Sequence, residues 1–364
     1  MTAATISRLP VTVVTGFLGA GKTTLLRHLL LNSGLRLAVI VNEFGDVGID
    51  GDLLAHCGFC PEEELEGRLV ELTNGCLCCT VQDEFLPTME RLLARADQLD
   101  ALVVETSGLA LPEPLVAAFQ WPEVRTRTRV HAVVTVVDGE ALAAGHVVGD
   151  VSSVETQRLA DPSLGHLSAL EDLFEEQLEV ADLVAVSRAD TVPAQALEAV
   201  MADLASKVRP GTPVLPMTRG ALDPELLLGQ AFAQTGQSGT VLEVEDEEDD
   251  HHPHDHAHVA MDSVVIRRWG RMARQEVETT LRVFLQQQPV LRLKGRLQEP
   301  GKRLSLQIQG VGPRLEAWYE GVSSAAPEVP SLELVALVPA AQRATVEAAA
   351  DRLWAALGSL DPSA

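Results

Sequence analysis

Residues 11–30, VTVVTGFLGAGKTTLLRHLL, decide the fold of this chain. The β-branched run Val11–Thr15 predicts a strand, the stretch Gly16–Thr23 a glycine-rich loop, and the stretch Thr23–Leu31 a helix. The loop has the form GxxxxGKT, which is the complete Walker A pattern in the strand–loop–helix context that this pattern requires. It predicts a nucleotide-binding loop made by Gly16, Gly19, Ala20, Gly21, Lys22, Thr23 and Thr24.

Each residue type in this loop has a physical task. Glycines let the loop wrap closely, so that backbone N–H groups converge on phosphate oxygens. Lys22 brings a positive charge to the outer phosphates, and the side-chain oxygen of Thr23 is a ligand for Mg²⁺. The helix that follows points its positive end at the same anion. We therefore expect Lys22 to take part in catalysis and Thr23 to hold Mg²⁺.

Apolar runs rich in Val, Ile and Leu alternate with helical stretches along the first two thirds of the chain. This alternation predicts an α/β fold, a mostly parallel sheet with helices on both faces. The expected strands are Val11–Thr15, Leu37–Val41, Leu69–Leu72, Ala101–Glu105, Val130–Val137, Leu183–Ser187 and Val214–Pro216, and the expected helices include Thr23–Leu31, Phe85–Ala96 and Ala194–Lys207.

The last third of the chain predicts a smaller α+β C-terminal domain. Its pattern is a strand, an amphipathic helix, three further strands and a final helix. The expected strands are Ser263–Arg267, Val290–Lys294, Leu304–Gln309 and Leu332–Leu337, and the expected helices are Arg274–Gln287 and Ala344–Leu357.

Charge locates the boundary between these two parts. The chain has 364 residues and a net charge of −24, and residues 243–259 hold eight acidic side chains and no basic one. This segment also contains five histidines between His251 and His258, and it has almost no apolar residues with which to pack. We expect three parts: a P-loop domain with the cysteine motif at 1–242, an acidic and His-rich linker at 243–259, and the C-terminal domain at 260–364.

The same composition excludes several classes of partner. A nucleic-acid or anionic-membrane binder would carry a basic face, which an excess of 52 acidic over 28 basic residues does not favour. No run of about 20 apolar residues occurs, and the first residues do not have the form of a secretory signal. We expect a cytoplasmic protein that binds neither nucleic acid nor a membrane.

A short motif after the strand Leu183–Ser187 bears on the choice of base. Guanine-binding proteins usually carry Asn-Lys-x-Asp there, and this chain has Ser187-Arg188-Ala189-Asp190. Asp190 can accept both N–H groups of the guanine edge, a pairing that adenine does not offer, and Arg188 can lie against the base. The alternative is an acidic residue that caps the next helix. The motif favours GTP over ATP.

All five cysteines lie between Cys57 and Cys79. Cys76, Cys78 and Cys79 follow an Asn-Gly turn, and three thiols in four residues can converge on one ion, with Zn²⁺, Co²⁺ and Cu⁺ all suited to such a soft site. A helix that starts near Thr80 would favour the thiolate of Cys79. Cys57 and Cys60 could form a second half-site or lie in a solvated loop. We expect Cys76, Cys78 and Cys79 to be metal ligands.

Acidic residues follow two of the expected strands at the edge where the phosphates would lie. Glu43 and Asp46 come after the second strand, where a loop can respond to hydrolysis; Glu43 could ligate a metal, and Asp46 or Asp50 could position the attacking water. The alternative is that this segment is a solvated acidic loop without a functional role. Glu105 ends another strand near the expected Mg²⁺, and we expect it to be catalytic together with Lys22 and Asp46. Gly108 lets the chain approach the γ-phosphate and is a further expected nucleotide-binding residue.

Taken together, these motifs resemble the CobW family of P-loop GTPases, which act as metal chaperones or insertases. The resemblance covers nearly the whole chain, and only Ser187-Arg188, in place of Asn-Lys, departs from the family pattern. The matching residues are Gly16–Thr24, Asn42–Gly45, Gly75–Cys79, Glu105–Gly108, Ser187–Asp190, His251–His258, Leu293–Gly295 and Gln309–Arg314.

The resemblance implies a P-loop GTPase that binds GTP, Mg²⁺ and a divalent cargo ion, Co²⁺ or Zn²⁺. It implies that Cys76, Cys78 and Cys79 hold the ion and that Glu43 lies on a metal-responsive switch. The stretch Gly310–Arg314 is most similar to the cobalamin-biosynthesis members, so the first expectation is cobalt delivery to a receiving protein such as a cobalt chelatase. A GTP-dependent dimer is compatible with this picture.

Three alternatives stay open at this point. A zinc chaperone of the same family would share every motif. A P-loop kinase would use Lys22 and Thr23 but leaves the thiols unexplained. A passive metal-storage protein would use the cysteines and histidines but has no need of a Walker A loop.

Overall fold

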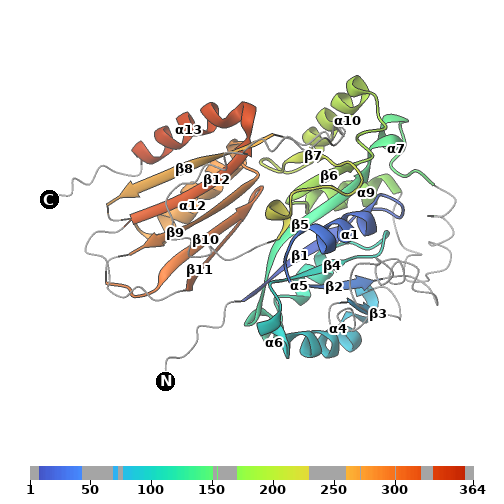
Figure 1. Ribbon diagram of the computed structural model, residues 1–364, viewed down its shortest axis with the longest axis horizontal. Coiled ribbons are helices and arrows are strands. Elements are labelled where there is room, and N and C mark those ends of the chain that lie inside the picture. The colour runs from blue at the N-terminus through green and yellow to red at the C-terminus, as the bar shows by residue number, and fades with distance from the viewer. Residues whose placement is uncertain are drawn as a thin grey trace, which may run out of the picture.

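The computed structural model describes residues 8–42, 69–72, 77–150, 154, 170–228, 260–270, 272–299, 301–320 and 331–356. Two sheets organise these residues (Figure 1). The larger sheet and its helices come from the first part of the chain, and the smaller sheet comes from the last part. The expected linker, residues 243–259, lies outside the described residues.

The larger sheet has seven described strands, each parallel to its neighbours, in the order β3-β2-β4-β1-β5-β6-β7. Every residue of β1, β4, β5 and β6 is buried, which explains why these strands are apolar runs without alternation. The expected parallel sheet is confirmed. Its strands are β1 Leu9–Thr15, β2 Leu37–Asn42, β3 Leu69–Leu72, β4 Ala101–Glu105, β5 Thr128–Asp138, β6 Leu183–Ser187 and β7 Val214–Pro216.

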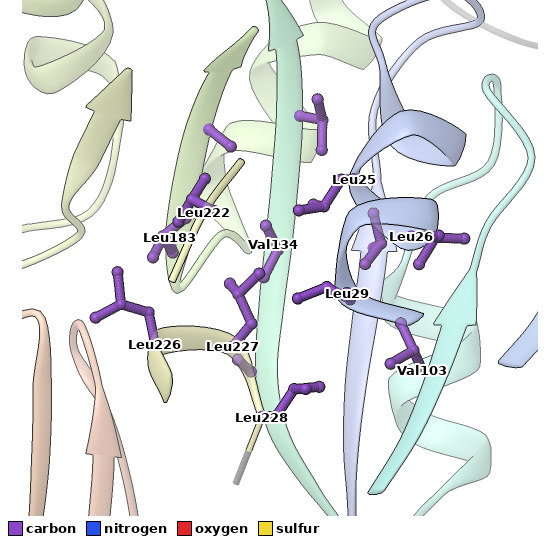
Figure 2. Close-up of a cluster of buried hydrophobic side chains, with 14 of the residues drawn as sticks. Leu25, Leu26, Leu29, Val103, Val134, Leu183, Leu222, Leu226, Leu227 and Leu228 are labelled. Atoms are coloured by element: carbon purple, nitrogen blue, oxygen red, sulfur yellow. The ribbon is translucent and has the colours of Figure 1, made fainter. Parts of the chain in front are cut away.

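Helices cover both faces of this sheet, as the sequence predicts. On one face, leucines of α1 and of the segment 222–228 converge on Val134 of β5 (Figure 2). Alternate strand residues point to the other face, where they meet Phe85 and Met89 of α4 and Phe119 after α5. The helices are α1 Lys22–Asn32, α4 Leu77–Leu93, α5 Glu113–Ala118, α6 Pro122–Arg125, α7 Gly139–Ala143, α9 Leu170–Glu179, α10 Ala194–Lys207 and α11 Pro224–Leu227.

The smaller sheet is antiparallel, in the order β11-β10-β9-β12-β8, and packs against α12 and α13 around one apolar core. The expected α+β domain is confirmed, with one strand more than the sequence predicts. The elements are β8 Met261–Trp269, α12 Arg274–Gln287, β9 Arg292–Gln298, β10 Ser305–Val311, β11 Arg314–Glu320, β12 Ser331–Pro339 and α13 Arg343–Ala356.

Polar contacts join the C-terminal domain to the domain of the larger sheet. Arg129 of β5 lies 4.2 Å from the ring centre of Trp318 in β11 and donates a hydrogen bond of 3.1 Å to Gln309 in β10. Lys294 of β9 pairs with Glu225 of α11 at 2.8 Å. The strands β10 and β11 therefore face β5 across this interface (Figure 1).

His131 of β5 lies buried beside this interface. Burial lowers its pKa well below the ordinary value near 6.5, and the charges of Arg292, Arg129, Lys294 and Arg314 lower it further. Because the folded-state pKa is depressed, the unfolded chain takes up the proton more readily. The stability contribution of neutral His131 is therefore complete above about pH 6.5 and decreases as the pH falls below that value.

We expect this residue to lower the free energy of unfolding by about 1.4 kcal/mol between pH 7.5 and pH 5.5. Denaturant titrations at the two pH values measure the change. The variant His131→Gln cannot titrate and should show a shallower pH dependence by that amount. Equal pH dependence in the two proteins would contradict the assignment.

Candidate nucleotide-binding site

The predicted phosphate loop, residues 16–21, connects the carboxyl end of β1 to the start of α1. Gly16 has a φ of 133°, and a Cβ there would collide with the carbonyl oxygen of Val136 in β5. A Cβ on Gly108 would lie 2.5 Å from the backbone nitrogen of Leu18. The loop after β4 thus packs directly against the phosphate loop, and only glycine fits at either position.

The other predicted loop residues lead into the helix. Gly19 and Gly21 have positive φ, and buried Ala20 donates its backbone N–H to the carbonyl of Phe17 at 3.1 Å. Helix α1 begins after Gly21 without a capping side chain, and Thr23 and Thr24 lie in its first turn. The backbone N–H groups of that turn are the donors that a helix N-terminus presents to an anion.

Lys22 and Glu105 lie together beside this loop, at the adjacent carboxyl ends of β1 and β4. The Nζ atom of Lys22 donates to the carbonyl oxygens of Gly16 at 2.8 Å and Phe17 at 3.2 Å. It also lies 3.8 Å from Oε1 of Glu105, and each of the two side chains is only 5% exposed. The structure therefore brings together two of the three residues predicted to be catalytic.

Ser187, Arg188 and Asp190, the residues predicted to contact the base, follow β6 directly. Arg188 has a φ of 54°, and its guanidinium pairs with Asp138 and donates to the carbonyl of Gly19 at 3.1 Å. Ser187 is buried next to Gly21, and within the described part of the chain its hydroxyl has no hydrogen-bond partner. Asp190 is exposed. The motif therefore lies beside the phosphate loop, with its acidic residue open to a ligand.

Sequence reasoning misses two residues that organise this site. Asp138, at the carboxyl end of β5, holds Arg188 and caps α7 by accepting from the N–H groups of Glu140 at 3.0 Å and Ala141 at 3.2 Å. Gln177 of α9 donates to the carbonyl of Gly108 at 3.4 Å. An acidic residue that ends a buried strand is a signal that could have found Asp138, whereas Gln177 has no such signal.

Several predicted residues lie outside what the structure describes: Glu43, Asp46, Asp50, Cys57, Cys60 and Cys76. Cys78 and Cys79 are described only as backbone, in the first turn of α4. This helix begins at Leu77, earlier than the expected Phe85 and ahead of Thr80.

Within the described segments, no group of three or more His, Cys, Asp or Glu side chains lies close enough together to hold a metal ion. No described helix is long and apolar enough to span a membrane.

The strand order and the glycine-rich loop define a P-loop protein of the parallel-sheet class. The family model of the CobW/HypB/UreG nucleotide-binding domain matches residues 10–216, and that of the cobalamin synthesis protein cobW C-terminal domain matches residues 261–353. This chain belongs to the CobW/HypB/UreG family.

Two similar proteins carry the name Zinc chaperone CobW. The one from Pseudomonas aeruginosa is 55% identical over 227 residues, 62% of this chain and 60% of that protein. The one from a Sinorhizobium species is 42% identical over 299 residues, 81% of this chain and 83% of that protein. A solved structure of the Zn(II)-bound YjiA GTPase from E. coli covers 97% of this chain at 21% identity, with a TM-score of 0.38.

Proposed function

We propose that this protein is a GTP-dependent zinc chaperone, which binds and hydrolyses GTP and passes a divalent ion from its cysteines to a receiving protein. The observation that carries the proposal is the strand register. Because β3 runs parallel to β2, and β2 to β4 and β1, the chain leaves β3 toward Cys76 at the same sheet edge as the phosphate loop. Three strand spacings separate β3 from β1, about 14 Å.

The names of the two relatives support zinc over the cobalt that the resemblance first suggests. The intrinsic metal affinity of the site also favours zinc, because a thiolate site binds Zn²⁺ more tightly than Co²⁺. We therefore propose zinc as the cargo, and a protein with an empty zinc site, in place of a cobalt chelatase, as the receiver. Cys76, Cys78 and Cys79 are the proposed ligands, with Glu43 as a further one.

The position of the cysteines at the start of α4 adds a physical reason. Cys78 and Cys79 lie in the first turn of this helix, whose N-terminal end carries partial positive charge. A helix N-terminus favours the thiolate form that a metal ligand needs. The strands β2 and β4 lie between β3 and β1. A change in the loops that follow these strands would then alter the ion site when GTP becomes GDP.

The residues at the phosphate loop fit a bound Mg²⁺, because a threonine in the first turn of α1 and the buried carboxylate of Glu105 both lie beside Lys22. When bound, Mg²⁺ would neutralise charge on the phosphates. Thr23 and Glu105 would hold it, Lys22 would stabilise the charge that develops on the transferred phosphoryl group, and Asp46 would orient the attacking water. These roles are part of the proposal.

We propose that the bound base is guanine and that Asp190 recognises it by accepting hydrogen bonds from its N–H groups. The variant Asp190→Asn should weaken GTP binding by about 10- to 100-fold. A carboxylate accepts from both N–H groups of guanine, whereas an amide accepts from one and places its own NH₂ group opposite the other. Competition against a fluorescent guanine nucleotide measures the change. Asp203→Asn, an exposed carboxylate on α10, is the control. An unchanged GTP affinity in Asp190→Asn would assign base reading to other residues.

One experiment separates the proposal from its two competitors. The protein is given GTP, Mg²⁺ and Zn²⁺ without any phosphoryl acceptor, and phosphate release and zinc transfer to an apo-protein are followed. A chaperone releases phosphate and transfers zinc faster with GTP than with GDP. A small-molecule kinase would release no phosphate, and a storage protein would transfer zinc equally in both states.

We further propose the domain division 1–242, 243–259 and 260–364, a cytoplasmic location and a GTP-dependent dimer.

A further inference from the structure

Helix α9 contacts both loops that surround the predicted phosphate site. Phe174 stacks on Phe17 of the phosphate loop, with ring centres 6.2 Å apart and planes inclined by 17°. Gln177, which is fully buried, donates its side-chain amide to the carbonyls of Gly108 at 3.4 Å and Ala110 at 3.3 Å. A buried amide loses these bonds at a cost, so a movement of the loop 108–110 would require α9 to follow it.

The chain that leaves α9 reaches the C-terminal domain within a few residues. The helix ends at Glu179, and β6 is preceded by Asp182, whose side chain is fully buried. Asp182 accepts from the N–H of Val133 at 2.8 Å and from Arg209 at 2.8 Å. The Oδ2 atom, which accepts from Val133, also pairs with Arg314 of β11. One buried carboxylate thus fixes the end of α9 to both domains.

The turn between β10 and β11 also packs on this point. Gly312 has a φ of 49°, and a Cβ there would collide with the carbonyl oxygen of Asp182 and lie 2.9 Å from Pro213. The stretch Gly310–Arg314, which has no part in the nucleotide site, therefore contacts Asp182, three residues after the C-terminal end of α9. A ten-residue helix, about 15 Å long, is a stiff connection between the two places.

We propose that α9 couples the nucleotide state to the docking of the C-terminal domain. Gln177 is the positioning residue at the nucleotide end, and the pair Asp182–Arg314 is the contact at the other end. The inference rests on the proposed GTP binding, and it gives the C-terminal domain a role in setting the preference for GTP over GDP. Because coupling between two sites is reciprocal, loosening the docking contact must change that preference.

The test uses the full chain and the ratio of the dissociation constants for GDP and a non-hydrolysable GTP analogue. Arg314→Gln should change this ratio by about 5-fold or more, although Arg314 lies in the other domain. Asp182 keeps Arg209 and the N–H of Val133 as partners in this variant, so its buried carboxylate stays paired. Arg314→Lys, which keeps the charge, should return the ratio toward that of the unmodified protein.

The matched control is Lys294→Gln, which removes another cation of the same interface, one paired with Glu225 and not with α9. It should leave the ratio unchanged. Gln177→Met should shift the ratio as Arg314→Gln does, and the double variant should shift it no further, because both changes act on one connection.

Two results would overturn the proposal: an unchanged ratio in Arg314→Gln, or equal shifts in Arg314→Gln and Lys294→Gln. The second result would mean that any weakening of the interface changes the ratio of dissociation constants, whether or not the lost contact is connected to α9. Failure of the proposed function has a different signature, since the unmodified protein would then bind neither guanine nucleotide.

Discussion

Replacing Lys22 by alanine is expected to lower the rate of GTP hydrolysis by at least about 100-fold. Lys22 is held at the centre of the phosphate loop by the carbonyls of Gly16 and Phe17, and it lies 3.8 Å from Glu105. Both side chains are buried, so charge interactions there are weakly screened. Phosphate release at saturating GTP measures the effect.

The control for this experiment is Lys207→Ala. Lys207 is a partly exposed lysine at the end of α10 whose described ion pair is with Asp203, one helical turn away. Its replacement should leave hydrolysis unchanged. If Lys22→Ala hydrolyses GTP as fast as the unmodified protein, the activity belongs to a different site.

Replacing Cys76, Cys78 and Cys79 together by alanine is expected to weaken zinc binding by more than about 100-fold. Loss of an outer-shell partner alone costs 10- to 100-fold, and this variant removes the proposed ligands themselves. Nucleotide binding should persist, because the phosphate loop lies about three strand spacings away. Competition with a zinc-binding dye, in parallel with nucleotide titration, measures both properties.

Cys57 and Cys60 provide the matched comparison, since they are the other two cysteines of the chain. Their double replacement by alanine should leave the tight ion in place. A tight zinc site that survives loss of the triplet, or one that is lost equally in both variants, would show that the ligand set is wrong.

The parts of the fold that could be predicted from sequence are those specified by local patterns. The apolar runs Val11–Thr15 and Ala101–Glu105 indicate buried parallel strands, and both strands are present. Because parallel strands end at one edge, this also predicts that Lys22 and Glu105 lie close together, as the structure has them. The sequence does not predict strand β11, because Arg314–Glu320 contains no β-branched residue and its side chains are mostly half-buried.

Contacts made through tertiary packing could not be predicted in this way. Gln177 bonds a loop nearly 70 residues away in sequence, and nothing in its neighbourhood distinguishes it from other polar helix residues. Asp182 and Arg314 are separated by 132 residues and belong to different domains. Their pairing depends on how the C-terminal domain docks, which no periodicity encodes. The start of α4 at Leu77 could not be predicted either, because the hydrophobic pattern there gives no signal.

In the proposed mechanism, the bound nucleotide sets the affinity of the protein for zinc. It is tested most directly by the affinity for zinc measured with a non-hydrolysable GTP analogue and again with GDP, with Co²⁺ and its thiolate charge-transfer band as a spectroscopic check on the ligands. We expect zinc to bind at least about 5-fold more tightly in the GTP state, and GTP to bind more tightly by the same factor when zinc is present. Equal zinc affinities in the two nucleotide states would contradict it.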